Sequence, residues 1–341
     1  MAPPSIDRPG AAASLRTRDR GWKGLARRSL HRLPDPLEVR VLAALGRRPP
    51  RTVTLEALDV ELTEAARLFD TSEDAARLFL RGFSLAPPSG RPADPFSPAY
   101  RDWVFSVYRS VSGRPDYSTD NEHSPFDEQA ALVRPYPHCT GSPTVLGEEL
   151  MARGFIIKAL GLAPPARVVE FGSGWGNLTL DLARVGFDVT AVEIEPRFCA
   201  LIEERGRELP NLRVSRSGML DFRADAPFDG AIFYEAFHHC ADHLAMLEHL
   251  HSLVRPGGRV LFAAEPVAPM AYPWGPRLDG YSLWSTRTYG WLELGFDEDY
   301  FAAALARTGW TATRRRDPAS SPLADVIVAT PLDDRRAIGR R

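Results

Sequence analysis

From Pro143 onward, short apolar runs alternate with longer amphipathic stretches. The apolar runs have the length and β-branched content of buried strands, whereas the longer stretches have helical spacing and begin or end at caps, prolines or glycines. Strands that alternate with helices of about 10–15 residues predict a parallel, doubly wound α/β sheet. The predicted strands are 166–171, 188–194, 211–216, 228–234, 259–266, 310–316 and 324–331, and the predicted helices are 142–161, 177–186, 196–209, 242–258 and 297–309.

Ahead of this alternation the pattern is helical. The stretch 52–83 predicts two helices with one apolar face each, and Thr71 with Asp74 resembles a helix start. The stretch 99–113 predicts a third, aromatic helix. We therefore expect a basic, partly disordered tail at 1–51, a helical cap or substrate domain at 52–140, an α/β domain at 141–332 and a flexible tail at 333–341.

Composition narrows the class of protein only a little. The net charge of −2 gives no global reason to expect nucleic acid as a partner, and 44% hydrophobic residues are ordinary for a globular protein. Three widely spaced cysteines without a CxxC pair suit a reducing compartment. No secretory h-region and no apolar run of about 18 residues is visible, so a cytoplasmic protein without a membrane segment is expected.

The turn after the first strand of the sheet, FGSGWGN, carries the most chemical information. A dinucleotide site needs G-x-G-x-x-G, whereas Gly172, Gly174 and Gly176 have the spacing G-x-G-x-G. Glu170 closes the strand, and its carboxylate would repel a pyrophosphate but attract the ammonium and sulfonium of S-adenosylmethionine (SAM). Glu193 ends the second strand, where it could accept both ribose hydroxyls of either ligand. The turn therefore favours SAM, with a dehydrogenase as the weaker alternative.

Three segments, VVEFGSGWGNLT, VTAVEIEP and FDGAIFYEAFHHCADHLAMLEHLHSLVRPGGRVLFAAEP, occur in this order. Together they resemble the successive motifs of a class I SAM-dependent methyltransferase of the small-molecule, biosynthetic type, over about residues 143–331. The resemblance implies a Rossmann-like sheet of seven strands with the last one antiparallel, SAM as cofactor, and an N-terminal helical extension.

The resemblance also implies a set of cofactor contacts. Strand one and its turn would line the methionine part, and Tyr234 would border both the methionine part and the acceptor. Gly218 stands where the family often has an acidic residue that contacts the adenine, with Asp221 as an uncertain substitute. The implied cofactor-binding residues are Glu170, Gly172, Ser173, Gly174, Glu193, Ile194, Met219, Leu220 and Tyr234.

The segment FHHCADH raises the questions of a metal and of a general base. His239 and His243 would share one face of a helix, but Asp242 resembles the cap, so the helix should begin after His239 and no metal site is expected. A hydroxyl acceptor benefits from proton removal, which His238 or Glu235 could perform. Glu265 ends the fifth strand at the same sheet edge and could bind the acceptor. A purely structural role stays open for all three of these catalytic candidates.

The insertion 270–296 is aromatic and rich in glycine and proline, and a long loop in a compact domain is usually functional. Tyr281, Trp284 and Arg287 are its acceptor-binding candidates, for a planar, sugar-like or anionic molecule. Tyr136 and His138, just before the first helix of the α/β domain, are further candidates. The alternatives are a packing plug or a homodimer contact.

These patterns predict methyl transfer from SAM to a small-molecule acceptor, such as a saccharide or secondary metabolite, on oxygen or nitrogen. One alternative is an RNA or protein methyltransferase that uses the arginine-rich N-terminus. The other is a SAM-binding regulatory protein without catalytic activity.

Overall fold

The computed structural model describes residues 50–69, 73–123 and 126–332. Both predicted tails fall almost entirely outside this range, as does the predicted helix start at Thr71. Within the described part, no helix has both the length and the apolar character needed to cross a membrane.

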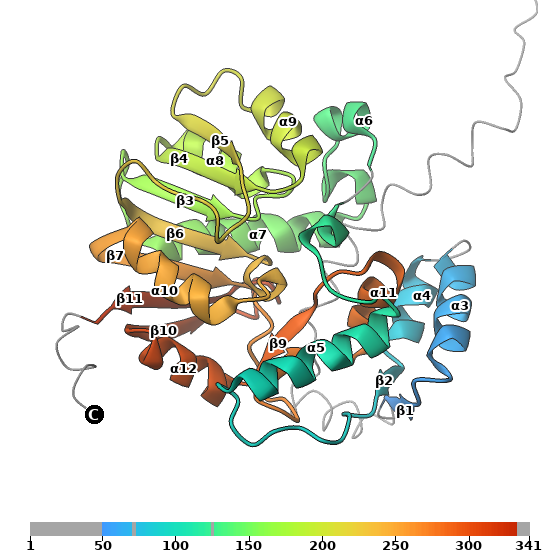
Figure 1. Ribbon diagram of the computed structural model, residues 1–341. Coiled ribbons are helices and arrows are strands. Elements are labelled where there is room, and N and C mark those ends of the chain that lie inside the picture. The colour runs from blue at the N-terminus through green and yellow to red at the C-terminus, as the bar shows by residue number, and fades with distance from the viewer. Residues whose placement is uncertain (1–49, 70–72, 124–125, 333–341) are drawn as a thin grey trace, which may run out of the picture.

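A seven-stranded sheet forms the centre of the molecule, as predicted (Figure 1). Its strand order is β10-β11-β7-β6-β3-β4-β5. The strands β5, β4, β3, β6 and β7 run parallel, and β11 is antiparallel to both of its neighbours, β7 and β10. Order reverses between β3 and β6, which is the point where such sheets bind ligands. The strands are β3 (Arg167–Phe171), β4 (Asp188–Glu193), β5 (Leu212–Arg216), β6 (Phe228–Tyr234), β7 (Val254–Ala263), β10 (Trp310–Arg316) and β11 (Asp325–Pro331).

Helices cover both faces of this sheet. On one face, α7 and α8 pack on β3, β4 and β6 through a buried aliphatic cluster, and α9 packs on β4 and β5. On the other face, α10 and α12 bury an aromatic-rich cluster. The helices are α7 (Pro143–Leu160), α8 (Asn177–Val185), α9 (Pro196–Arg205), α10 (His243–Leu253) and α12 (Glu298–Arg307).

The predicted helix 242–258 is too long at its C-terminal end. Helix α10 stops at Leu253, and the segment RPGG already belongs to β7. Pro256 cannot donate a backbone hydrogen bond in a helix, and Gly257 adopts a φ of 77°. Both residues therefore end the helical pattern earlier than the apolar spacing suggests.

The N-terminal region contains the expected helices and one feature that was not expected. A short parallel pair of strands brackets its first two helices, with Val53 opposite Leu85. The elements are β1 (Arg51–Val53), α3 (Leu58–Phe69), α4 (Glu73–Leu80), β2 (Phe83–Leu85), α5 (Pro98–Ser112), η3 (Thr119–Glu122), α6 (Glu128–Val133) and η4 (His138–Thr140).

The insertion after β7 is a folded element and not a loop, contrary to the sequence-based expectation. It contains β8 (Trp274–Pro276), α11 (Gly280–Tyr289) and β9 (Leu294–Phe296), with β8 and β9 paired antiparallel. Asp279 caps α11 by accepting from Ser282 N, and Gly290 ends it in the left-handed conformation.

This insertion and the N-terminal helices pack into one lobe beside the sheet (Figure 1). Helix α5 joins the lobe to the sheet, because its buried residues belong to the same cluster as residues of β3, β6 and α10. Tyr100 Oη donates to Trp274 O at 3.1 Å and Tyr108 Oη donates to Gly290 O at 2.6 Å. The N-terminal segment is thereby held over the carboxyl edge of the sheet.

Candidate functional site

A cavity of about 280 Å³ lies at the carboxyl ends of β3, β4 and β6, at the reversal of strand order. This volume is near the lower end of the range for small-molecule sites. Segments far apart in the sequence converge on it: the η3 region, the turn after β3, the end of β4, the segment after β5 and the segment after β6. The lining residues are Tyr117, Thr119, Glu122, Gly172, Val192, Glu193, Ile194, Phe198, Ser217, Gly218, Met219, Leu220, Asp221, Ala236, His239, Cys240, Ala241 and Asp242.

The glycine turn brings the backbone close to this cavity. Gly172 has a φ of 67°, and a Cβ there would lie 2.7 Å from Ala236 Cβ. Only glycine fits such a position without strain. Glu193 lies opposite, 5% exposed, and its carboxylate accepts from Gly174 N at 2.8 Å, Ile194 N at 2.8 Å and Glu195 N at 3.0 Å. Backbone donors thus fix a carboxylate at the cavity wall, with about one of its four lone-pair sites left for a hydroxyl group.

Gly218 and Asp221 adjoin each other in the part of the cavity lining that follows β5. A Cβ on Gly218 would lie 2.9 Å from Asp221 Oδ2 and 4.0 Å from Ile194 Cδ1. The Asp221 carboxylate therefore occupies the space beside Gly218, where the resemblance implies an acidic side chain. Met219 and Leu220 line the same end of the cavity.

Glu170 is close to the turn but does not line the cavity. Its carboxyl accepts from Thr179 Oγ1 of α8 and is 3% exposed. Burial raises the pKa of Glu170 to about 8, and the nearby carboxylates of Asp181 and Glu193 also raise it. At neutral pH this carboxyl is mostly protonated, which weakens the electrostatic argument that singled it out.

Three further residues of the implied cofactor set also lie outside the lining. Ser173 Oγ donates to Glu170 O at 3.1 Å, and Gly174 reaches the cavity only through its N–H, which holds Glu193. Tyr234 Oη donates to Glu149 Oε2 of α7 at 2.8 Å. Burial raises the pKa of Tyr234 well above its ordinary value, so its phenol stays protonated. Its side chain is turned toward α7, which explains why it does not border the cavity.

The opposite wall of the cavity is polar and was not identified from the sequence. Tyr117 Oη donates to Glu122 Oε1 at 3.1 Å, and His239 Nδ1 lies 3.3 Å from Glu122 Oε2. Leu292 N also donates to Glu122 Oε1, at 3.0 Å. Burial raises the pKa of Tyr117 well above its ordinary value, so it acts as a hydrogen-bond donor. We call Tyr117, Glu122 and His239 the polar wall.

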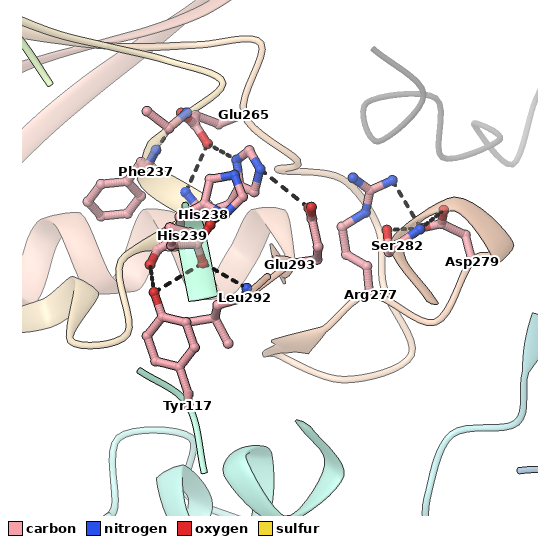
Figure 2. A network of polar contacts seen from close by, with 12 residues as sticks. Tyr117, Phe237, His238, His239, Glu265, Arg277, Asp279, Ser282, Leu292 and Glu293 are labelled. Atoms are coloured by element: carbon pink, nitrogen blue, oxygen red, sulfur yellow. Dashed lines mark hydrogen bonds and ion pairs between the residues drawn. The ribbon is translucent and has the colours of Figure 1, made fainter. Parts of the chain in front are cut away.

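Behind the polar wall, two of the three catalytic candidates from the sequence, His238 and Glu265, belong to one network (Figure 2). His238 is fully buried, with Nδ1 2.8 Å from Glu265 Oε2 and Nε2 3.5 Å from Glu293 Oε2. Glu265 accepts from the backbone, which places it under the turn after β6 and away from the cavity. Glu235 has a φ of 53°, an uncommon conformation for a residue other than glycine, and it does not line the cavity.

Two other side chains of FHHCADH have no evident chemical role. Burial lowers the pKa of His243 to about 3, and its Nε2 lies 2.7 Å from Tyr300 Oη. His239 belongs to the short helix η5 (Phe237–His239), whereas His243 begins α10. His239 and His243 therefore do not share the face of one helix. Cys240 lines the cavity, but burial raises the pKa of its thiol to about 12, which rules out a thiolate at neutral pH.

The five predicted acceptor-binding residues do not meet at the cavity. Tyr281 and Trp284 are buried in the core of the lobe, where Trp284 contacts Phe69 with ring centroids 5.4 Å apart. Arg287 forms a bidentate ion pair with Asp59 of α3, at 2.9 and 2.8 Å. Because these three side chains are used in packing the insertion against the N-terminal helices, the structure favours the packing alternative for them.

The two upstream candidates differ from each other in exposure. Tyr136 is 5% exposed, and its carbonyl accepts from Asn177 Nδ2 at 2.6 Å, at the start of α8. His138 is exposed in η4. Neither side chain is part of the cavity lining.

Comparisons with known proteins agree with this geometry. Residues 169–262 match the family described as "Methyltransferase domain". The ubiquinone biosynthesis O-methyltransferase of Xanthomonas campestris pv. campestris (strain B100) is 28% identical over 168 residues, which is 48% of this chain and 70% of that protein. The demethylmenaquinone methyltransferase of Beutenbergia cavernae is 29% identical over 192 residues, which is 50% of this chain and 77% of that protein.

Among solved structures, a Burkholderia thailandensis 1,6-didemethyltoxoflavin-N1-methyltransferase with bound 1,6-didemethyltoxoflavin and S-adenosylhomocysteine (SAH) has a TM-score of 0.43 and 22% identity, covering 62% of this chain and 93% of that chain. A glycopeptide N-methyltransferase complexed with SAM has a TM-score of 0.41 and 17% identity, covering 55% and 93%.

Three findings indicate SAM as the cofactor and methyl transfer as the reaction. They are the strand order, the glycine turn with the carboxylate at the end of β4, and the match to the methyltransferase domain. This chain is a class I SAM-dependent methyltransferase.

Proposed function

We propose that this enzyme methylates a hydroxyl group of a small molecule, with the polar wall activating the acceptor. The observation that carries the proposal is the Glu122 carboxylate. It lines the same cavity as Gly172 and Glu193, and its side chain is 14% exposed. A carboxylate that is held by its neighbours and faces the methyl donor is suited to removing a proton.

In this proposal the cavity has a donor side and an acceptor side. Glu193 accepts hydrogen bonds from the ribose hydroxyls of SAM, Ile194 and Met219 pack on the adenine, and Asp221 accepts from its amino group. The acceptor lies between the sulfonium and the polar wall, which places its oxygen in line with the methyl group.

The reaction balances without another reactant. The acceptor oxygen forms a bond to the methyl carbon as the carbon–sulfur bond breaks, and the bonding electrons remain on sulfur as SAH forms. Glu122 takes up the hydroxyl proton, while Tyr117 Oη and Leu292 N hold its Oε1 in place. The products are a methyl ether, SAH and one proton.

Two supporting observations favour a small hydroxylated acceptor. The cavity has a volume of about 280 Å³, which is of the size that small-molecule sites have. One of the relatives bears the name of an O-methyltransferase in the biosynthesis of ubiquinone.

The experiment supplies SAM with a ¹³C-labelled methyl group to three fractions of a bacterial extract: small molecules, protein and RNA. We expect label in the small-molecule fraction, with the NMR chemical shift of an O-methyl group. Label confined to protein or RNA, or an N-methyl shift, would contradict the proposal.

A further inference from the structure

The residues behind the polar wall form a cluster of metal-ligating groups that methyl transfer does not explain. His238, His239 and Glu293 each place one ligand atom within 4.8 Å of the others. Figure 2 shows the imidazole of His238, in the turn after β6, directed toward the Glu293 carboxylate in the segment before β9, with His239 beside it. His239 also lines the cavity, so the cluster adjoins the acceptor side.

The hydrogen bonds of Glu265 determine the tautomer of His238. Glu265 Oε1 accepts from Ala236 N and Phe237 N, both at 2.8 Å, and its Oε2 accepts from His238 N at 3.1 Å. A carboxylate surrounded by donors is favoured in its charged form, which can only accept. His238 Nδ1, 2.8 Å from Oε2, is therefore the protonated ring nitrogen, and the lone pair of this imidazole lies on Nε2.

His239 has a related arrangement. Its Nδ1 lies 3.3 Å from Glu122 Oε2, within ion-pair distance of that carboxylate. In metal sites, a ligating histidine almost always donates its other ring N–H to a carboxylate or carbonyl group. His238 has Glu265 in that position, and the carboxylate nearest to Nδ1 of His239 in the ion pairs is that of Glu122.

Glu293 is the side chain that the protein alone leaves unsatisfied. It is 1% exposed, and within the described part of the chain neither of its oxygens accepts a hydrogen bond. Its Oε2 lies 3.5 Å from His238 Nε2, so a carboxylate oxygen faces an imidazole lone pair. The buried guanidinium of Arg277 forms its ion pair with Asp279 at 3.0 Å.

We propose that His238, His239 and Glu293 bind one divalent transition-metal ion, for which Zn²⁺ is the best chemical match. Imidazole nitrogen with carboxylate oxygen suits zinc, and three protein ligands leave a fourth tetrahedral position open. Ligand atoms of such a site are roughly 3.3 Å apart, from metal–ligand distances of about 2.0–2.1 Å. The His238–Glu293 separation of 3.5 Å is already close to this value.

The chemical role of this ion rests on the proposed function. Because His239 is part of the cavity lining, the open position would face the acceptor. A hydroxyl oxygen bound there is polarised and loses its proton more easily, in this case to Glu122. The metal thus selects acceptors with a hydroxyl that can reach both groups.

Direct metal titration tests the site without any acceptor. The protein is treated with a chelator, desalted and titrated with Co²⁺ by visible absorption and with Zn²⁺ by calorimetry. We expect one ion per chain with a tetrahedral Co²⁺ spectrum, and at least about 10-fold weaker affinity in Glu293→Gln. Glu149→Gln is the matched control, since Glu149 is also buried but hydrogen-bonds Tyr234 outside the cluster. Absence of saturable binding, or equal affinity in wild type and Glu293→Gln, would overturn the site.

SAH binding shows whether each variant is folded, and the expected SAH affinity of Glu293→Gln is that of the wild type. If that variant does not fold, His239→Gln replaces it, because this side chain lies at the cavity wall and not in the core; it should also weaken metal affinity at least about 10-fold. Labelled O-methyl product formed by a protein that binds no metal would overturn the metal site alone. A bound metal together with label only in protein or RNA would overturn the proposed function alone.

Discussion

At the scale of single residues, Glu193 illustrates how the fold prepares a carboxylate for a ligand. Its two oxygens accept three backbone N–H groups, one of them from the glycine turn. The carboxylate therefore cannot rotate away from the cavity without losing those bonds. In the proposed binding mode, Glu193 couples cofactor affinity to the conformation of the glycine turn.

Replacing Glu193 with Gln should weaken SAH binding by about 10–100-fold, because the amide NH₂ would face backbone donors and bind ribose hydroxyls poorly. Calorimetric titration with SAH measures the change. Asp188→Asn is the control, since Asp188 begins the same strand but pairs with Arg213 away from the cavity. Affinities within about twofold of each other in wild type and Glu193→Gln would contradict the ribose role.

Glu170 should make the stability of the protein depend on pH. Its pKa of about 8 in the folded state exceeds the ordinary value of 4.5, so the folded state binds more protons than the unfolded state between these values. The free energy of unfolding therefore falls as pH rises from about 5 to about 8. Thr179 and Arg153 lower this pKa, but burial, together with the charges of Asp181 and Glu193, raises it by more.

Glu170→Gln cannot ionise, so its stability should decline less over that pH range than that of the wild type. Urea unfolding midpoints in the presence of a chelator and without cofactor, at several pH values from 5 to 8, measure both slopes. Part of the slope should remain in the variant, because Glu293 also has a pKa of about 8. Parallel curves for the two proteins would show that Glu170 does not titrate in this range.

At the scale of elements, the central sheet was predictable and the insertion was not. Apolar runs such as VVEF and AIFY are buried in parallel strands, where a continuous apolar pattern is expected. Helix α11 is buried on most sides within the lobe, and its buried residues are both polar and apolar. Its sequence therefore lacks the one apolar face by which a helix is recognised. The cap at Asp279 and the ending at Gly290 were the signals that could have revealed this helix.

Trp284→Ala should lower the free energy of unfolding by about 3–5 kcal/mol, because it removes a large buried side chain from the lobe. The milder Trp284→Phe should lower the melting temperature but leave the KM for the acceptor unchanged, since Trp284 contacts Phe69 and not the cavity. Val133→Ala, at an 81% exposed position, is the control for stability. A raised KM in the folded Trp284→Phe variant would restore the acceptor-binding role predicted from the sequence.

The candidate site was predictable only in part, because some of its residues lie far apart in the sequence and outside the strand-end motifs. Gly172, Glu193 and Ile194 lie at the carboxyl ends of the consecutive strands β3 and β4, and the motif order indicated all three. Glu122 and Tyr117 lie in a polar segment with no periodicity, and more than a hundred residues separate them from His239. Their approach depends on how α5 and the insertion pack, which no local pattern encodes.

At the scale of the whole molecule, the proposed arrangement takes the donor side of the cavity from the sheet and much of the acceptor side from the N-terminal segment. The glycine turn and the ends of β4 and β5 line one part, and Tyr117, Thr119 and Glu122 line the other. Helix α5 fixes these parts relative to each other because its side chains are shared with the sheet core. The N-terminal segment is thus an integral part of the site.

Tyr117→Phe should slow methyl transfer about 10-fold while leaving SAH affinity unchanged, because it removes one donor that holds Glu122 but no donor-side contact. Steady-state kinetics with the acceptor identified by the labelling experiment provide kcat, and calorimetry provides the SAH affinity. An unchanged kcat, or a parallel loss of SAH binding, would separate Tyr117 from the acceptor side.

The most direct test of the account is the single-turnover rate of methyl transfer in Glu122→Gln, with the enzyme preloaded with SAM. Gln retains the shape of the side chain and can still accept from Leu292 N, but it cannot take up the acceptor proton. The account predicts a rate at least about 100-fold below that of the wild type, with SAH affinity unchanged. A rate within about twofold of the wild type would show that the polar wall does not activate the acceptor.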